Sequence, residues 1–210
     1  MNATARAFAA SPQQDELRGT LLDAVAASGT ASSDFDLNPG LVLPPGRKLR
    51  PAAVLVAVID GRHGPEVLLT KRSARLKHHP GQVAFPGGKL DPTDRNATAA
   101  ALREAREEVG LSPHTVDVLG ELSPHETVTG FNVTPVLAMA QPFVPELEAG
   151  EVAEAFAVPF AHLANPANYV IERRRWRGTW RSYYTVPYGP YYIWGATARM
   201  LRALADRLPR

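Results

Sequence analysis

Three glutamates crowd one short stretch of the chain, REAREE at residues 103–108. Glu104, Glu107 and Glu108 are spaced i, i+3, i+4, so in a helix they share one face and their charges repel one another. A solvated face beside Arg103 and Arg106 is the ordinary explanation for such a charge run. The alternative is a hard-cation site, because Mg²⁺ and Mn²⁺ prefer oxygen ligands and would relieve the repulsion.

Cations gather a short distance upstream of these glutamates. Residues 71–79 hold four permanent cations and two histidines, namely Lys71, Arg72, Arg75, Lys77, His78 and His79. Such a cluster is often only a solubilising loop, and it lacks the interleaved aromatic residues of a nucleic-acid surface. A small polyanion is the better partner, because cations can hold phosphates while nearby carboxylates hold a metal that bridges them.

A helix must present the glutamates. The pattern predicts one from about Thr98 to Val109, ended by Gly110 in the position that favours a left-handed residue. Its small and apolar residues form a core-facing stripe, made by Ala101, Leu102, Ala105 and Val109. The glutamates lie off that stripe, so the helix can be buried on one side and still offer them to a ligand.

Mixed strands and helices are expected around this helix. Strands are predicted at 52–59, 66–70, 82–85, 116–122, 132–140, 169–175 and 179–186. Helices are predicted at 12–27 after Ser11 as N-cap, in a short segment near 151–164, and at 194–208. Residues 28–50 are rich in Gly, Ser and Pro and are expected to be a connecting loop. The chain is therefore predicted to be one α/β layered domain over 51–210, preceded by an N-terminal helix and loop over 1–50.

Composition narrows the class of protein. The chain has 210 residues, of which 45% are hydrophobic and 21% charged, as in soluble globular proteins. A net charge of +2 does not by itself imply a nucleic-acid or membrane partner. There is no cysteine, no secretory signal pattern at the N-terminus, and no apolar run of the roughly 20 residues that span a bilayer. We expect a soluble cytoplasmic protein without a membrane partner.

The segment REAREEVGL at 103–111 resembles the second half of the Nudix box, in which Arg-Glu and Glu-Glu pairs precede a glycine and an apolar residue. The first half departs from the box in two ways. Five residues separate Gly88 from Asp94, which stands where the box has Glu, and eight residues rather than seven separate Asp94 from Arg103. The spacing among the three glutamates is unaffected, so the metal-site hypothesis stands while Asp94 is left without an assigned role.

The preceding segment, 68–88, is similar to the signature of the coenzyme A pyrophosphatase branch of that superfamily. Nine positions match it: Leu68, Leu69, Thr70, Ser73, Gly81, Phe85, Pro86, Gly87 and Gly88. Lys77 stands where the branch usually has Arg, which keeps the charge but loses the bidentate fork. The resemblance implies a Nudix fold, an α/β/α sandwich around a mixed β-sheet, and metal-dependent hydrolysis of coenzyme A or acyl-coenzyme A.

The resemblance and the chemistry of phosphoanhydride hydrolysis together suggest roles for the acidic residues. Glu104 and Glu108 are the expected principal ligands of Mg²⁺ or Mn²⁺, and Glu107 would hold a further metal or position water. The carbonyl of Gly87 or Gly88 would complete the coordination, and Arg103 would orient the glutamates by ion pairing. Glu104 itself or Glu151 would take the proton from the attacking water.

Eight residues are expected to bind substrate: Arg72, Ser73, Arg75, Lys77, Gly81, Phe85, Gly87 and Phe131. Phe131 is equally well explained as a core aromatic at the start of a strand, and His125 with Glu126, near a turn, is typical of a structural pair. Rival functions stay open. They are hydrolysis of another nucleoside diphosphate derivative (ADP-ribose, NADH or a dinucleoside polyphosphate), non-catalytic nucleotide binding, and nucleic-acid binding through 71–79 and 173–181. A homodimer is also left open.

Overall fold

The computed structural model describes residues 11–27, 29–41, 46–176 and 178–209. Parts of the expected N-terminal loop and one residue of the basic segment 173–181 lie outside this described portion. Within it, nine strands form one mixed sheet, in the order β1-β7-β8-β2-β3-β4, with β5, β6 and β9 joined at its flanks. Two further strands form a separate hairpin.

Strand β2 (Arg50–Gly61) is the spine of the sheet. It runs parallel to β8 (Phe131–Ala140) on one side and antiparallel to β3 (Gly64–Arg72) and β5 (Gly87–Lys89) on the other. The remaining strands of the sheet are β1 (Ser32–Ser33), β4 (Val83–Ala84), β6 (Val116–Glu121), β7 (His125–Glu126) and β9 (Val152–Pro159). Because β5 pairs with β2, the glycines that follow Phe85 are fixed at the centre of the sheet.

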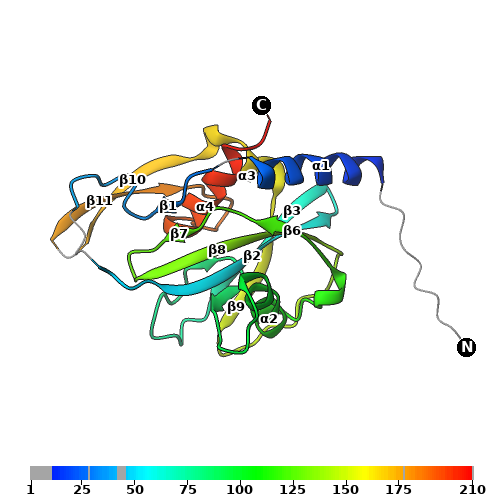
Figure 1. Cartoon of the computed structure of the whole chain (residues 1–210), viewed down its shortest axis with the longest axis horizontal. Helices are drawn as coiled ribbons and strands as arrows, with labels where there is room; N and C mark the ends of the chain where they lie inside the picture. Colours follow the sequence, from blue (N-terminus) through cyan, green and yellow to red (C-terminus); the bar gives the residue numbers. More distant parts are fainter. Residues whose placement is uncertain (1–10, 28, 42–45, 177, 210) are drawn as a thin grey trace, which may run out of the picture.

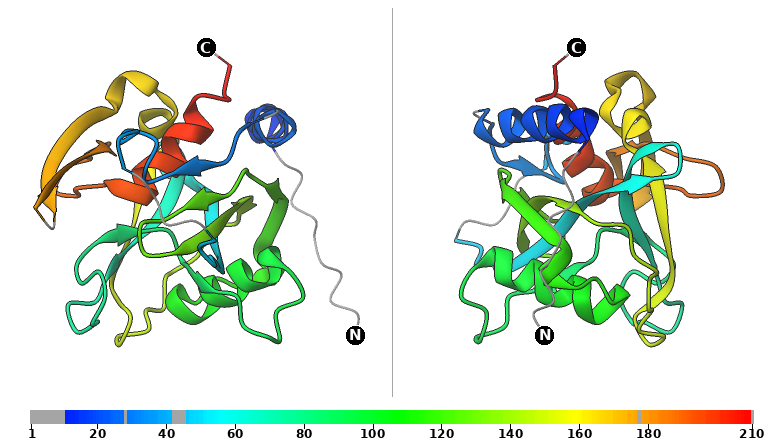
Figure 2. Two further views of the ribbon diagram at one scale, coloured as in Figure 1. Left: turned by 60° about the vertical axis from the view of Figure 1, so that its left-hand side comes forward. Right: turned by 90° about the vertical axis from the view of Figure 1, so that its right-hand side faces the viewer.

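Helices cover both faces of the sheet, which confirms the predicted α/β/α sandwich. Helix α2 (Ala97–Val109) packs on one face, and α1 (Pro12–Ala26), α3 (Phe160–Ala164) and α4 (Gly195–Ala205) lie on the other (Figures 1 and 2). Two short 3₁₀ turns, Pro113–Thr115 and Pro166–Asn168, connect elements. No helix in the described portion is both long and apolar enough to cross a membrane.

Alternation along β2 explains the two cores. Ala53, Leu55 and Ala57 point toward α2, whereas Val56 and Val58 belong to the cluster on the opposite face. The α2 side is built largely from alanines, including three of the helix, so helix and sheet approach closely. This close packing fixes the height of α2 above the sheet and hence the position of its glutamates.

The helix predicted near 151–164 is wrong over most of its length. Residues Val152–Pro159 form β9, which pairs antiparallel with β3 from Glu66 to Arg72, and only Phe160–Ala164 is helical. Alanine and glutamate in this stretch favour a helix locally. Pairing with β3 overrides that preference because it satisfies the backbone of a strand whose Val67, Leu68 and Leu69 are buried.

The hairpin of β10 (Val170–Trp176) and β11 (Thr179–Thr185) projects from the sandwich, at the left of Figure 1. Both strands were expected from the sequence. Asn38 ties the hairpin to the N-terminal segment, since its side chain bonds the carbonyl and the N–H of Ser182 at 2.9 and 2.8 Å. The hairpin therefore stands beside α4 and the N-terminal segment and forms one wall of the hollow described below.

Candidate active site

Helix α2 begins and ends on capping residues. The side chain of Asn96 accepts a hydrogen bond from Ala99 N at 2.8 Å, and Gly110 closes the helix with a φ of 73°. With its alanine face on β2, the helix turns Glu104 and Glu108 toward the glycines of β5. The geometry therefore brings together two segments that the sequence analysis had linked only by resemblance.

Glu108 is a buried carboxyl, only 4% exposed. Gly87 N donates to its Oε2 at 3.1 Å. Burial raises the pKa of Glu108 to about 7; the Gly87 hydrogen bond and the charge of Arg72 oppose this rise, and the charges of Glu104 and Glu151 add to it. Burial thus outweighs the stabilising contacts that Glu108 receives from Gly87 and Arg72.

Glu104 lies against the backbone of Gly88. A Cβ on Gly88 would come within 2.4 Å of Glu104 Oε1, so only glycine admits the carboxylate here. The pKa of Glu104 is raised by burial and by the charges of Glu107 and Glu151, while Arg103 lowers it. Two of the three helix glutamates, and Glu151 from the turn before β9, therefore share one electrostatic neighbourhood.

Arg103 bonds several acidic groups at once. Its Nη1 lies 3.0 Å from Glu104 and 2.9 Å from Glu107, and its Nη2 lies 2.9 Å from Asp94 and 3.2 Å from Lys89 O. Asp94, left without a role by the sequence, is thus a partner of this arginine. Its side chain is 5% exposed and also accepts from Asp91 N at 2.8 Å, which fixes the loop before α2.

Glu151 lies in the turn that precedes β9. Its carbonyl accepts a hydrogen bond from Ser73 N at 2.8 Å, which ties the turn before β9 to the end of β3. The expectation that a helix would follow Glu151 is corrected, because β9 follows it. Its charge nevertheless contributes to the raised pKa of both Glu104 and Glu108.

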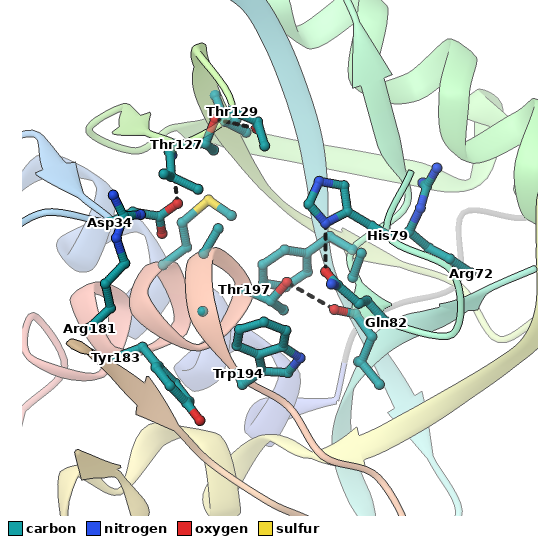
Figure 3. Close-up of a pocket in the computed structure, with 18 of the residues that line it drawn as sticks. Asp34, Arg72, His79, Gln82, Thr127, Thr129, Arg181, Tyr183, Trp194 and Thr197 are labelled. Atoms are coloured by element: carbon teal, nitrogen blue, oxygen red, sulfur yellow. Dashed lines mark hydrogen bonds between the residues drawn. The ribbon is translucent and has the colours of Figure 1, made fainter. Parts of the chain in front are cut away.

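A cavity of about 540 Å³ lies between the sheet, the β10–β11 hairpin and α4 (Figure 3). Arg72 and Phe85, both expected to bind substrate, line it. Arg72 also acts electrostatically on Glu108, and its Nε is buried without a hydrogen-bond partner among the described residues. Arg72 therefore stands where the cavity meets the acidic cluster.

The other expected substrate residues lie elsewhere. Ser73 is buried at the turn after β3, where its Oγ accepts from Arg75 N at 3.3 Å. Phe131 lies under the guanidinium of Arg50, 4.0 Å from ring centre to Cζ. Of the described residues that line the cavity, none is Arg75, Lys77 or Gly81. Roles for these five residues in binding stay predictions.

Comparison with known proteins decides the family. The NUDIX domain model matches residues 48–177. The chain belongs to the Nudix family. It is 46% identical over 161 residues to the uncharacterized Nudix hydrolase NudL of Cronobacter sakazakii, covering 74% of this chain and 81% of that protein. The uncharacterized Nudix hydrolase NudL of Salmonella paratyphi B is 44% identical over 161 residues, covering the same 74% of this chain and 81% of that protein. As a Nudix protein with the complete glutamate cluster, the chain is a hydrolase of phosphoanhydrides.

Solved structures give partial matches to this chain. RenU of M. smegmatis gives a TM-score of 0.47 at 28% identity, covering 55% of this chain and 73% of that one. An Ap4A hydrolase of C. elegans gives a TM-score of 0.46 at 22% identity, covering 52% of this chain and 80% of that one.

Nudix hydrolases require a divalent metal ion, and the donor set here fits one in its chemistry. Carboxylates suit Mg²⁺ or Mn²⁺. Burial raises the pKa of Glu104 and Glu108 above the ordinary value, and the charges of neighbouring carboxylates add to the rise, so a bound cation would stabilise their ionised forms. Among the described residues, no three acidic or histidine side chains are gathered into a metal-ligand group, and Arg103 pairs with Glu104 and Glu107. Binding of a cation would therefore compete with Arg103 for these glutamates.

Several cavity residues lie outside the Nudix match or were not singled out by the sequence. They are Asp34, Thr127, Thr129, Trp194 and Thr197, with Arg174 and Arg175 of the hairpin. The sequence analysis had named 173–181 only as part of a rival nucleic-acid surface. Asp34 carried no local signal, since it lies in a loop-like stretch far from the Nudix box.

Proposed function

We propose that this Nudix hydrolase cleaves the pyrophosphate bond of coenzyme A or acyl-coenzyme A, releasing adenosine 3′,5′-bisphosphate and 4′-phosphopantetheine or its acyl derivative. The observation that carries the proposal is the position of Arg72. It lines the 540 Å³ cavity and its charge acts on Glu108, so a substrate in the cavity would place a phosphate beside the acidic cluster.

Hydrolysis needs a neutralised pyrophosphate, an aligned water and a base. A divalent cation, when bound, neutralises the phosphate oxygens and polarises the phosphorus. Glu104, Glu108 and the carbonyl of Gly88 would hold it, with Glu107 free to contribute once Arg103 releases it. Glu151 or Glu104 would accept the proton of the attacking water, as one P–O bond forms and the bridging P–O bond breaks. Arg72 would hold a phosphate oxygen from the cavity side.

Preference for coenzyme A over other nucleoside diphosphate derivatives is supported by two features. The segment 68–88 carries the branch signature at nine positions. The hairpin brings Arg174, Arg175 and Arg181 to the cavity, and a cluster of guanidinium groups suits the additional 3′-phosphate that distinguishes coenzyme A from ADP-ribose.

A substrate panel tests this proposal. The purified protein would be given coenzyme A, acetyl-coenzyme A, ADP-ribose, NADH and a dinucleoside polyphosphate, each with Mg²⁺, with Mn²⁺ and with EDTA. We expect coenzyme A or its acyl derivative to give the highest kcat/KM, and EDTA to stop the reaction. Cleavage of ADP-ribose with coenzyme A left intact would make the substrate assignment wrong, while leaving the hydrolase class in place.

A further inference from the structure

The N-terminal segment 32–38 forms part of the cavity wall. Strand β1 pairs parallel with β7, and Asp34 N donates to Glu126 O at 3.0 Å. Asn38 bonds the backbone of Ser182 at the other end of the segment. This segment precedes the Nudix match at 48–177, and α4 follows it, so the family's common domain does not supply these walls. Residues that set this chain's own selectivity are to be sought there.

Asp34 is held rigidly in this wall. Its Oδ2 accepts from Val128 N at 2.8 Å, and its Oδ1 lies 3.2 Å from His125 Nε2. His125 is fully buried, and its Nδ1 lies 2.9 Å from Ser32 Oγ. An ionised carboxylate only accepts, so Nε2 donates to Asp34 and, in neutral His125, Nδ1 accepts from the Ser32 hydroxyl. The backbone N–H of Val128 and the buried ring of His125 thus hold the Asp34 carboxylate in place.

The carboxylate keeps acceptor capacity for a ligand. It has about four lone-pair sites, and the hydrogen bonds from His125 Nε2 and Val128 N use two of them. Among the described residues that line the cavity, Asp34 is the one carboxylate. Figure 3 shows it across the cavity from Arg72, which borders the acidic cluster. A substrate group that contacts Asp34 therefore lies in the part of the substrate remote from the scissile bond. It must be a hydrogen-bond donor, because the carboxylate only accepts.

The remaining walls suit the nucleoside end of a substrate. Tyr183 and Trp194 line the cavity with aromatic rings against which a base could stack. Arg174 and Arg175 offer cations for a phosphate on the ribose. A flexible chain ending in a thiol would make no use of these charges, so the base and its ribose phosphate fit this cavity better.

We propose that Asp34 determines base specificity by accepting a hydrogen bond from the 6-amino group of adenine. The proposal rests on the proposed function for the nucleotide class of the ligand. A carboxylate in this position selects against hypoxanthine, because the 6-oxo group of that base is an acceptor and would face an acceptor.

Affinity for matched nucleotides tests this without depending on turnover. Calorimetry would compare adenosine 3′,5′-bisphosphate with inosine 3′,5′-bisphosphate, and AMP with IMP. The unmodified protein should bind the adenine member of the better-binding pair about 10- to 100-fold more tightly, the range expected for a hydrogen bond to a charged group. Asp34→Asn, of the same shape and able to donate through its amide, should bring the two affinities within about threefold.

Asp36→Asn is the matched control. Asp36 lies in the same segment but pairs with Arg199 at 2.8 Å and does not line the cavity, so its variant should keep the adenine preference. Equal affinities in the unmodified protein, no binding of either adenine nucleotide, or an unchanged preference in Asp34→Asn would each overturn the proposal. The first two outcomes need no variant to fold. An adenine preference in a protein that leaves coenzyme A intact would support Asp34 while defeating the substrate assignment.

Discussion

Asp94 and Arg103 form a two-point ion pair, with Nη2 to Oδ2 at 2.9 Å and Nε to Oδ1 at 3.1 Å. The same guanidinium contacts Glu104 and Glu107. The loop residue that departs from the Nudix box is therefore linked through Arg103 to the glutamates. An inserted residue before α2 is compatible with this contact, because the Asp91–Asp94 turn carries the carboxylate to the arginine.

Replacing Asp94 with Asn should lower kcat/KM about 10- to 100-fold, because Arg103 would lose the partner that fixes it and the glutamates would be less well placed. Steady-state kinetics on the substrate identified by the panel would measure this. Asp117→Asn, which removes an exposed ion pair with Arg18 far from the site, is the control and should leave the rate unchanged. Equal rates for both variants would mean that Asp94 does not support the site.

Replacing Glu108 with Gln should reduce metal-dependent turnover by roughly a factor of a thousand or more while the fold is retained, because the amide loses the charge that a divalent cation needs. Gly87 N can still donate to the amide oxygen. Rates with saturating Mg²⁺ and Mn²⁺ would be compared with those of Glu16→Gln, an exposed change on α1. Full activity in Glu108→Gln would defeat the metal assignment.

The metal-free protein should lose stability as pH rises, through Glu108. Its pKa is about 7 in the folded protein against an ordinary 4.5, so the folded state holds a proton that the unfolded state releases. Stability from this group is complete below about pH 4.5 and is lost as pH rises toward 7 and beyond. With EDTA at pH 8, the free energy of unfolding of Glu108→Gln should be larger than that of the unmodified protein by on the order of 2 to 3 kcal/mol. At pH 5 the difference should be much smaller.

Denaturant unfolding at both pH values, with and without Mg²⁺, measures that difference. A divalent cation should reduce this stability difference at pH 8, because the cation supplies a positive charge next to the buried Glu108 carboxylate. If Glu108→Gln and the unmodified protein were equally stable at both pH values, the pKa of Glu108 would not be raised in the folded protein.

Replacing Gly88 with Ala should impair activity more than stability. The new Cβ would lie 2.4 Å from the Glu104 carboxylate, the mobile end of a side chain that can move away. Displacing this ligand should lower kcat/KM about 10- to 100-fold while the melting temperature changes little. Gly19→Ala in α1 meets no atom within 4 Å and serves as the control. An active Gly88→Ala variant would place Glu104 outside the catalytic group.

Helices whose ends depend on residues nearby in the chain were predicted well from the sequence. The helix predicted from about Thr98 to Val109 with Gly110 after it matches α2, and the first helix follows Ser11 as predicted, although Asn96, which caps α2, was not singled out. Strand β9 was mistaken for a helix because the residues of β3 with which it pairs lie 80 to 93 positions earlier in the chain, and no short window of sequence contains that pairing.

Distance along the chain also hid part of the site. Asp34 reaches the cavity only because His125 and Val128, more than ninety residues away, bind its carboxylate. The Asp94–Arg103 contact spans nine residues, yet the box pattern alone gave Asp94 no role. The glutamate cluster was visible because its three members share one helix face, a relation that sequence spacing states directly.

Product analysis of coenzyme A incubated with the protein and Mg²⁺ tests the central claim most directly. Mass spectrometry should find adenosine 3′,5′-bisphosphate and 4′-phosphopantetheine in equal amounts, formed only with a divalent cation and absent for Glu108→Gln. Unchanged coenzyme A under conditions in which another nucleoside diphosphate derivative is hydrolysed would contradict the claim.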